Sequence, residues 1–202
     1  ELYPFEMSGG MNRRVLVSTA LMGNPRLVIA DEPTPGLHMD MVRRVMSHFR
    51  QMADDGAGVL LITHDLEQAL EVADRVVVFY AGTTVEDADV KDFEKEETLR
   101  HPYSKALWRA LPQNGFQFID GVQPYVKDLP EGCPFGPRCE KCTEECKGKI
   151  AYREVRDGRA RCIPAVKEEL CYWKQRIYLL NMEKIQNRFW KISVCLWKAM
   201  NE

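Results

Sequence analysis

Two short apolar runs near the front of the chain predict buried β-strands. Leu27–Ala30 and Val59–Ile62 are unbroken by polar residues, as expected for parallel strands that are covered on both faces. Between them, apolar residues recur at helical spacing over about 41–53, and Asp54-Asp55-Gly56 then ends the pattern. Strand, helix and strand in this order predict a parallel βαβ unit.

A helix is also expected to precede this unit. Apolar residues recur at helical spacing within 15–21, directly behind Ser8-Gly9-Gly10, and Gly23-Asn24-Pro25 ends the pattern. A helix that begins at these glycines would present free backbone N–H groups to an anion. Taken alone, the same three residues are more often a simple turn.

Behind the unit, the pattern predicts a short helix, a strand and a hairpin. Asp65 and Gln68 have the spacing of a capped helix start. Val76–Tyr80 is a further apolar strand, which Ala81-Gly82 turns back into a second strand. Charged helical stretches follow, with one helix expected near Tyr103–Ala110.

These elements predict an α/β fold with a parallel sheet and three segments. Residues 1–111 form the α/β part, 112–166 an irregular domain that begins in a Pro- and Gly-rich stretch, and 167–202 a helical tail. One face of the tail carries an apolar stripe and nearby basic residues, so it either packs on its own domain or lies on a membrane or partner. The stripe consists of Ile185, Phe189, Ile192, Leu196 and Met200.

Composition narrows the class of protein. The net charge of −2 is too small for nucleic-acid binding through bulk electrostatics. No run of about 18 apolar residues predicts a membrane span, and Glu1 opens the sequence without a secretory leader, so we expect a cytosolic protein. In that compartment the seven cysteines favour metal ligation or free thiols over disulfides.

Polar residues follow both apolar runs where the predicted strands end. Asp31 and Glu32 follow the first run, and His64 follows the second. Ligands of open α/β sheets bind at the carboxyl ends of the strands, and adjacent acids there point to opposite sides. One acid can serve a Mg²⁺ shell while the other polarises water, as phosphoryl transfer requires, and the histidine can donate to a phosphate oxygen. An isolated Asp-Glu pair would more often cap a loop.

Together these motifs resemble the nucleotide-binding subunits of ABC transporters, which have a P-loop NTPase core. In chain order, the resembling segments are Met7–Met11 with Arg14 (signature), Leu27–Glu32 (Walker B), Pro33-Thr34, His64 (switch histidine), Asp74-Arg75-Val76 and Tyr80-Ala81-Gly82.

The resemblance implies ATP and Mg²⁺ as cofactors and assigns roles to individual residues. Asp31 would lie on the Mg²⁺ side, Glu32 would be the catalytic base, and His64 would sense the γ-phosphate. The signature residues Ser8, Gly9 and Gly10 would act in trans, on ATP held by a second ATPase subunit in a head-to-tail dimer.

Two departures from the family pattern limit this expectation. The D-loop acid is replaced, because Pro35-Gly36-Leu37-His38 follows Thr34. A Gly-rich Walker A loop with its lysine does not occur between Glu1 and Glu202; it would lie upstream of Glu1, with the stacking aromatic and the Q-loop glutamine. We therefore expect the chain alone to bind ATP weakly.

The cysteine-rich segment resembles the C-terminal extension of peptide and nickel importer ATPases, as do His101-Pro102-Tyr103 and Leu111-Pro112 before it. In some members four cysteines ligate a 4Fe-4S cluster. Carried over, the ligands would be Cys133, Cys139, Cys146 and Cys162. A structural Zn²⁺ and reduced thiols are the alternatives, and Cys142 could compete as a ligand. Cys171 and Cys195 are expected to be ordinary helix residues.

The leading hypothesis is an ATP-binding and ATP-hydrolysing subunit, truncated at its front, of an importer for oligopeptides, dipeptides or nickel. Its partners would be a second ATPase, identical or paralogous, transmembrane permease subunits and indirectly a solute-binding protein. It would lie peripherally on the cytoplasmic face of the membrane. The alternatives are a non-catalytic, metal-stabilised module that lends its signature motif to a partner ATPase, and a fragment whose first half is lost.

Overall fold

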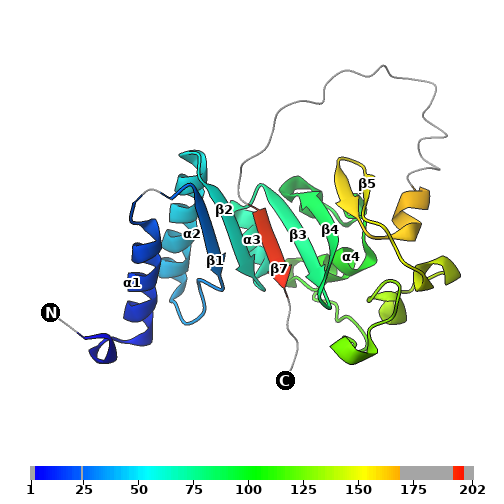
Figure 1. The fold of residues 1–202 in the computed structure, drawn as a ribbon, viewed down its shortest axis with the longest axis horizontal. Helices are drawn as coiled ribbons and strands as arrows, with labels where there is room; N and C mark the ends of the chain where they lie inside the picture. Colours follow the sequence, from blue (N-terminus) through cyan, green and yellow to red (C-terminus); the bar gives the residue numbers. More distant parts are fainter. Residues whose placement is uncertain (1–2, 24, 169–192, 198–202) are drawn as a thin grey trace, which may run out of the picture. The chain divides into compact units, whose positions relative to one another are not determined.

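The computed structural model describes residues 3–23, 25–168 and 193–197 (Figure 1). The chain forms two compact units, one containing the described residues up to Arg75 and the other those from Val76 to 168. Strand β7 (Ser193–Trp197) lies mainly in the first unit. The two units are described separately below.

The first unit contains the predicted βαβ arrangement. Strands β1 (Leu27–Asp31) and β2 (Gly58–Thr63) are parallel, and α2 (Met39–Asp54) connects them. Asp31 pairs with Ile62, so both strands end at the same edge of the sheet. One face of α2 is buried, because its apolar residues recur at helical spacing. The buried residues are Val42, Val45, Met46, Phe49 and Ala53.

Two further predicted helices are confirmed in this unit, each with a side-chain cap. Helix α1 (Gly9–Leu21) begins after Ser8, whose Oγ accepts a hydrogen bond from the Met11 N–H at 3.3 Å. Helix α3 (Leu66–Val72) begins after Asp65, whose carboxylate caps the Gln68 N–H at 3.1 Å. A short 3₁₀ turn, η1 (Pro4–Glu6), precedes α1.

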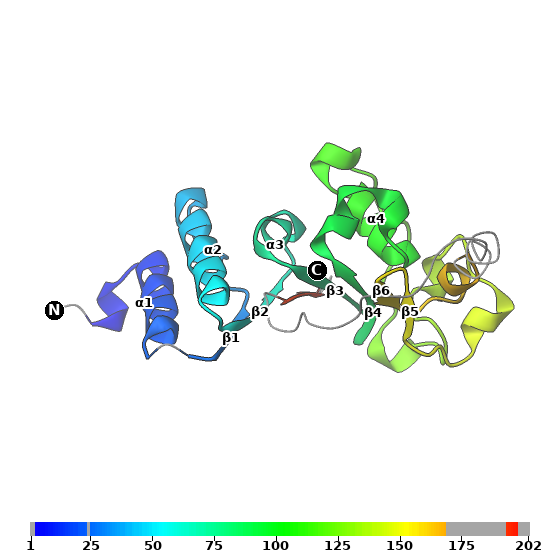
Figure 2. The same ribbon diagram turned by 90° about the horizontal axis from the view of Figure 1, so that it is seen from above.

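The expectation that β1 is covered on both faces is wrong for the described residues. Val28 and Ala30 are buried, whereas Leu27 and Ile29 are 57% and 62% exposed. Figure 2 shows the reason: α2 and α3 lie on the same side of β1 and β2. An unbroken apolar run therefore has only one covered face here.

The second unit contains the predicted hairpin. Strand β3 (Arg75–Tyr80) turns into β4 (Thr83–Asp89) through Ala81 and Gly82. Both turn residues have positive φ values, 45° and 78°, as a two-residue type I′ turn requires.

A second hairpin, which the sequence analysis did not predict, extends this sheet. Strands β5 (Arg153–Val155) and β6 (Gly158–Ala160) are antiparallel, and β6 pairs with β4 through Glu86 and Ala160. Within this unit the strand order is β3-β4-β6-β5.

Short helical turns make up most of the rest of the second unit. The predicted helix near Tyr103 is confirmed as α4 (Pro102–Arg109), and residues 163–168 are also helical. The Pro- and Gly-rich stretch is irregular, as expected. The 3₁₀ turns are η2 (Val90–Glu94), η3 (Glu96–Thr98), η4 (Pro112–Asn114), η5 (Val126–Asp128), η6 (Gly136–Arg138) and η7 (Glu144–Lys147).

The tail differs from its prediction where it is described. Residues 193–197 form β7, which pairs in parallel with β2, so Cys195 and Leu196 belong to a strand and not to a helix. The other stripe residues and Cys171 lie outside the described residues. The boundaries expected at 111/112 and 166/167 remain predictions. Within the described ranges, no helix is long and apolar enough to cross a membrane.

Candidate functional site

The structure brings two of the predicted site residues into direct contact at the edge where β1 and β2 end. Glu32 Oε1 lies 2.7 Å from His64 Nδ1 and also accepts a hydrogen bond from the His64 backbone N–H at 3.1 Å. The pair forms because the parallel register places the residues after Asp31 opposite those after Ile62. One carboxylate oxygen thus fixes both the ring and the backbone of His64.

Glu32 itself is held in an uncommon backbone conformation. Its φ is 44°, in the left-handed region that non-glycine residues seldom adopt, and its N–H donates to the Ile62 carbonyl at 2.9 Å. Its second carboxylate oxygen, Oε2, is buried and has no hydrogen-bond partner among the residues that the structure describes. Backbone strain and a buried unpaired oxygen are features that folded proteins keep at functional sites.

Asp31 is exposed at the last position of β1, one residue before Glu32. The two carboxylates therefore leave the strand in different environments, since Glu32 is only partly accessible. An exposed carboxylate at a strand end suits a hydrated Mg²⁺ ion, which binds through one or two carboxylates and keeps several waters.

The predicted signature residues form the start of α1, next to the loop that follows Glu32. A Cβ on Gly10 would lie 4.0 Å from the Gly36 carbonyl oxygen, whereas a Cβ on Gly9 would meet nothing within 4 Å. Arg13 Nε donates to the Pro33 carbonyl at 3.3 Å. In the described part of the chain, no hydrogen bond joins Ser8, Gly9 or Gly10 to Glu32 or His64.

The departure in the D-loop is visible as an exposed turn. Gly36 has a φ of 76°, and the Leu37 N–H donates to the Thr34 carbonyl at 3.1 Å. His38 stands at the N-cap of α2 without a capping hydrogen bond, and its side chain is 85% exposed. His38 therefore plays no part in the Glu32–His64 contact.

A second candidate site lies in the other unit, where the structure gathers the four predicted cysteine ligands around one small pocket. Cys133, Cys146 and Cys162 are buried, and Cys139 is partly buried. The pocket wall also includes the exposed Cys142 and the buried His101.

The pocket depends on a close crossing of two backbone segments at Gly132. The Cys133 N–H donates to the Cys146 carbonyl at 2.9 Å. A Cβ on Gly132 would lie only 2.0 Å from that carbonyl oxygen, so no larger residue fits this crossing without a backbone shift. Two backbone turns lie between these residues, closed by hydrogen bonds from the Gly136 N–H to the Cys133 carbonyl and from the Cys142 N–H to the Cys139 carbonyl, at 2.8 Å and 3.1 Å.

The donors of this pocket are thiols, and burial opposes their ionisation. Burial raises the pKa of Cys133 to about 11 and that of Cys162 to about 12, so both thiols stay protonated at neutral pH unless a cation replaces the proton. Within the described residues, no three His, Cys, Asp or Glu side chains are close enough together to hold a single metal ion. The alternative to the expected 4Fe-4S cluster, a Zn²⁺ ion, needs its four thiolates to converge on one atom, whereas a cluster separates them by its own width.

Comparison with known proteins gives the family. Residues 1–35 match the family described as "ABC transporter", and residues 85–146 match "Oligopeptide/dipeptide transporter, C-terminal region". The chain is 38% identical to the dipeptide transport ATP-binding protein DppD of Haemophilus influenzae over 153 residues, 73% of this chain and 46% of that protein. The chain belongs to the ABC transporter ATP-binding proteins of the oligopeptide/dipeptide family.

Two further relatives of this ABC family agree in name and coverage. The oligopeptide transport ATP-binding protein OppD of Escherichia coli is 36% identical over 177 residues, 84% of this chain and 52% of that protein. The oligopeptide transport ATP-binding protein AppD of Bacillus subtilis is 40% identical over 150 residues, 71% of this chain and 45% of that protein. The chain spans about half the length of these relatives and matches their C-terminal portion. None of the three names refers to nickel.

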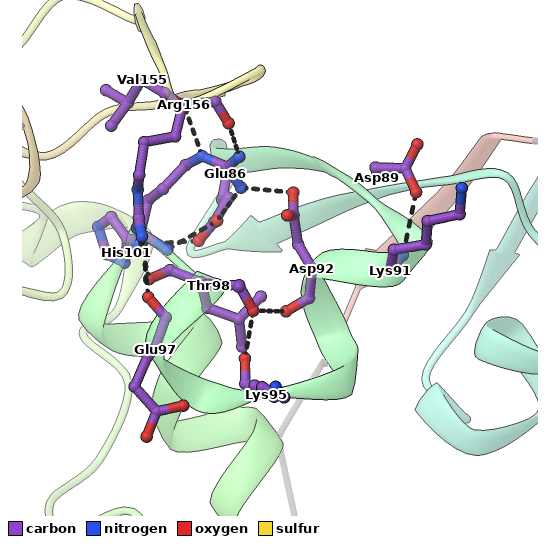
Figure 3. A network of polar contacts seen from close by, with 12 residues as sticks. Glu86, Asp89, Lys91, Asp92, Lys95, Glu97, Thr98, His101, Val155 and Arg156 are labelled. Atoms are coloured by element: carbon purple, nitrogen blue, oxygen red, sulfur yellow. Dashed lines mark hydrogen bonds and ion pairs between the residues drawn. The ribbon is translucent and has the colours of Figure 1, made fainter. Parts of the chain in front are cut away.

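The sequence analysis of this ABC protein missed a buried polar network beside the cysteine pocket (Figure 3). Glu86 is fully buried and accepts hydrogen bonds from the backbone N–H groups of Arg100 and His101, at 2.9 Å and 2.7 Å. Arg100 also donates from its guanidinium to Glu86 at 3.3 Å, to Asp92 at 2.7 Å and to the Val155 carbonyl at 2.5 Å. A charged residue inside the strand β4 was the available signal, because such residues are seldom buried unless paired.

Aromatic packing joins this network to the cysteine-rich segment. Phe135 lies next to Cys133's turn, and its ring is 5.4 Å from Tyr80 and 5.3 Å from Tyr103, centroid to centroid. Arg138 donates to the Tyr80 hydroxyl at 3.1 Å. The cysteine-rich segment therefore packs on β3 and α4 within one unit.

Proposed function

We propose that this chain carries the hydrolytic half of an ATP-binding subunit that powers peptide import. The observation that supports this most strongly is the Glu32–His64 pair at the carboxyl ends of two parallel strands. One oxygen of Glu32 is buried and has no hydrogen-bond partner within the described ranges. The matches to peptide transporter ATP-binding proteins support the same assignment.

In this proposal Glu32 orients the attacking water and His64 contacts a phosphate oxygen. Glu32 Oε1 is held by His64, so Oε2 is left to accept a hydrogen bond from the attacking water and orient it. Because Nδ1 of His64 faces Glu32, Nε2 is the ring nitrogen left for a phosphate oxygen. Asp31 would hold Mg²⁺ through the ion's water shell, and Mg²⁺ would neutralise charge on the phosphates.

The start of α1 would serve a different nucleotide, bound to a second ATPase subunit. The space beyond Gly9 is open, so a phosphate can approach the N-terminal N–H groups of α1 closely. Contacts of Gly10 and Arg13 with the loop after Glu32 would link that phosphate to this chain's own hydrolytic pair.

We further propose that the phosphate-cradling half of the subunit covers the bare apolar face of the first unit. The exposed side chains there come from α1 and β1 and include Val15, Leu16, Leu27 and Ile29. Exposed apolar side chains favour a contact surface where they gather, and the relatives are about twice as long as the matched segment. The occupant would supply the Lys-bearing glycine loop that the printed sequence lacks.

The relatives' names support peptides as the transported solute. An ATP-binding subunit of a peptide importer would have membrane permease subunits as partners. The subunit would lie peripherally on the cytoplasmic side of the membrane and pair with a second ATPase, identical or paralogous.

The test is Glu32→Gln in a complete transporter that contains this segment. Removing the general base is expected to slow ATP hydrolysis by roughly 10²–10⁴-fold, with ATP binding retained. Glu67→Gln on α3 is the matched control, because it makes the same change on an exposed face and should leave hydrolysis unchanged. Full turnover by the Glu32 variant would contradict the proposal and favour the non-catalytic module that only donates Ser8-Gly9-Gly10.

We also propose that the cysteine pocket binds a 4Fe-4S cluster through Cys133, Cys139, Cys146 and Cys162. The support is the set of thiols that line one pocket. Cys142 is the exposed member and is left out of the ligand set.

Anaerobic purification and reconstitution with iron and sulfide would test the cluster. The expected result is four irons and four sulfides per chain with visible charge-transfer absorption, lost in Cys162→Ser and retained in Cys142→Ser. A colourless protein with one zinc per chain would establish the Zn²⁺ alternative, and a metal-free protein would establish reduced thiols.

A further inference from the structure

The ring of His101 forms part of the cysteine pocket, and both of its nitrogens have a partner. Nδ1 accepts a hydrogen bond from the Tyr103 backbone N–H at 3.0 Å, which caps α4. Nε2 lies 3.7 Å from Cys133 Sγ, within hydrogen-bonding range for sulfur. Only 1% of His101 and 8% of Cys133 is exposed, so water does not compete for either contact.

The cap determines which nitrogen carries the proton. A nitrogen that accepts a hydrogen bond bears no hydrogen, so a neutral His101 ring carries its proton on Nε2. That N–H points to Cys133. The hydrogen bond at one nitrogen of a histidine commonly sets the tautomer seen by a metal site at the other.

The backbone of His101 is fixed from the opposite side. Its N–H donates to Glu86 Oε2 at 2.7 Å, and Glu86 is in turn held by Arg100 (Figure 3). Three parts of the fold therefore hold His101: Cys133 of the pocket contacts Nε2, α4 contacts Nδ1, and Glu86 on β4 binds the backbone N–H.

We propose that His101 is a positioning residue for the Cys133 sulfur, to which it donates an N–H···S hydrogen bond from Nε2. The hydrogen bond stabilises negative charge on that sulfur and keeps its lone pairs directed into the pocket. For a bound cluster, which rests on the function proposed above, this raises the reduction potential, because hydrogen bonds to ligand sulfurs favour the more negative, reduced state.

Two variants separate this role from a structural one. His101→Asn keeps a side-chain oxygen that can cap the Tyr103 N–H, since asparagine is a favoured cap, but it is too short to reach Cys133. Ser104→Ala is the matched control. It removes a fully buried hydroxyl from the same helix, and that hydroxyl has no hydrogen-bond partner in the described part of the chain.

The first measurement determines the tautomer in the reduced, metal-free wild-type chain and uses His101→Asn only to assign the signals. Long-range ¹H–¹⁵N correlation of the histidine side chains should show one ring, assigned by its loss in His101→Asn, as the Nε2–H tautomer. An Nδ1–H tautomer for that ring would overturn the hydrogen bond itself.

The second measurement compares reconstituted proteins during anaerobic titration with dithionite, which supplies one electron per cluster without making or breaking a ligand bond. At the wild-type midpoint, the ratio of reduced to oxidised cluster should fall about three- to tenfold in His101→Asn, where tenfold corresponds to 59 mV, and stay unchanged in Ser104→Ala. An unchanged ratio in His101→Asn would overturn the tuning role. Failure of the wild type to take up iron and sulfide would instead overturn the cluster, while the tautomer result would stand.

Discussion

Removing the Glu86 carboxylate should destabilise the second unit more than any surface charge change. Glu86→Ala leaves two buried donors without their acceptor, the backbone N–H groups of Arg100 and His101, and removes one of the two carboxylate partners of the Arg100 guanidinium. Both residues are at most 3% exposed, so water cannot replace the carboxylate. Each orphaned donor costs about 1–3 kcal/mol, and breaking a buried ion pair typically costs about 3–5 kcal/mol.

We expect a total loss of about 3–5 kcal/mol, within the range of about 2–6 kcal/mol for two orphaned donors, because Arg100 keeps Asp92 as an anionic partner and its charge is not left unpaired. Urea denaturation followed by circular dichroism would measure it. With a slope of about 2 kcal/mol per molar urea, the midpoint should fall by about 2 M. Hydrogen–deuterium exchange should accelerate most at the Arg100 and His101 amides.

Glu96→Gln provides the comparison, since Glu96 pairs with Arg109 on a partly exposed surface, with side chains 24% and 42% exposed. Its loss should cost no more than about 1 kcal/mol. The reasoning about the buried network would be refuted if Glu86→Ala shifted the urea midpoint no further than Glu96→Gln does.

Three other substitutions probe separate features. Asp65→Ala removes the cap on the Gln68 N–H and should lower the free energy of unfolding by about 1 kcal/mol in urea titrations, whereas Asp65→Asn should retain most of it. Burial, with a smaller contribution from Tyr80, raises the pKa of Tyr103 to about 12. The unfolded chain loses this proton at lower pH than the folded chain does, so the free energy of unfolding should decline between pH 10 and 12. In Tyr103→Phe, pH titration of the free energy of unfolding should show a decline about 2–3 kcal/mol smaller. Gly158→Ala would place a Cβ 2.6 Å from Arg100 Cζ, so thermal unfolding should show a loss of about 1–3 kcal/mol, and a wild-type melting temperature would contradict that clash.

The sequence predicted best the elements whose signals are local. Leu27–Ala30 and Val59–Ile62 form parallel strands around α2, and the hairpin at Ala81-Gly82 is present. Apolar runs, helical spacing and turn residues need no knowledge of distant neighbours. The sequence also predicted that Glu32 and His64 follow neighbouring parallel strands, whose ends meet at one edge of the sheet; their direct contact was not predicted.

Features that depend on distant partners were not predictable in this way. The hairpin of β5 and β6 consists of short, partly charged segments, and β6 pairs with β4, which lies more than 70 residues earlier along the chain. An apolar run likewise does not tell which of its faces is covered, and Leu27 and Ile29 proved to be exposed. The burial of Glu86 depends on Arg100 and on the backbone that leads into α4.

The backbone crossing at Gly132 has a thermodynamic meaning for the cysteine pocket. The hydrogen bond from Cys133 to Cys146 closes a loop of about 13 residues, and closing such a loop costs about 2 kcal/mol in chain entropy. Because the loop closes when the chain folds, this entropy loss is part of the free energy of folding and does not reduce the affinity of the pocket for a ligand. A larger residue at position 132 would keep the two backbone segments apart, so the loop would have to close when the ligand binds. Affinity for the ligand would then fall even in a chain that still folds.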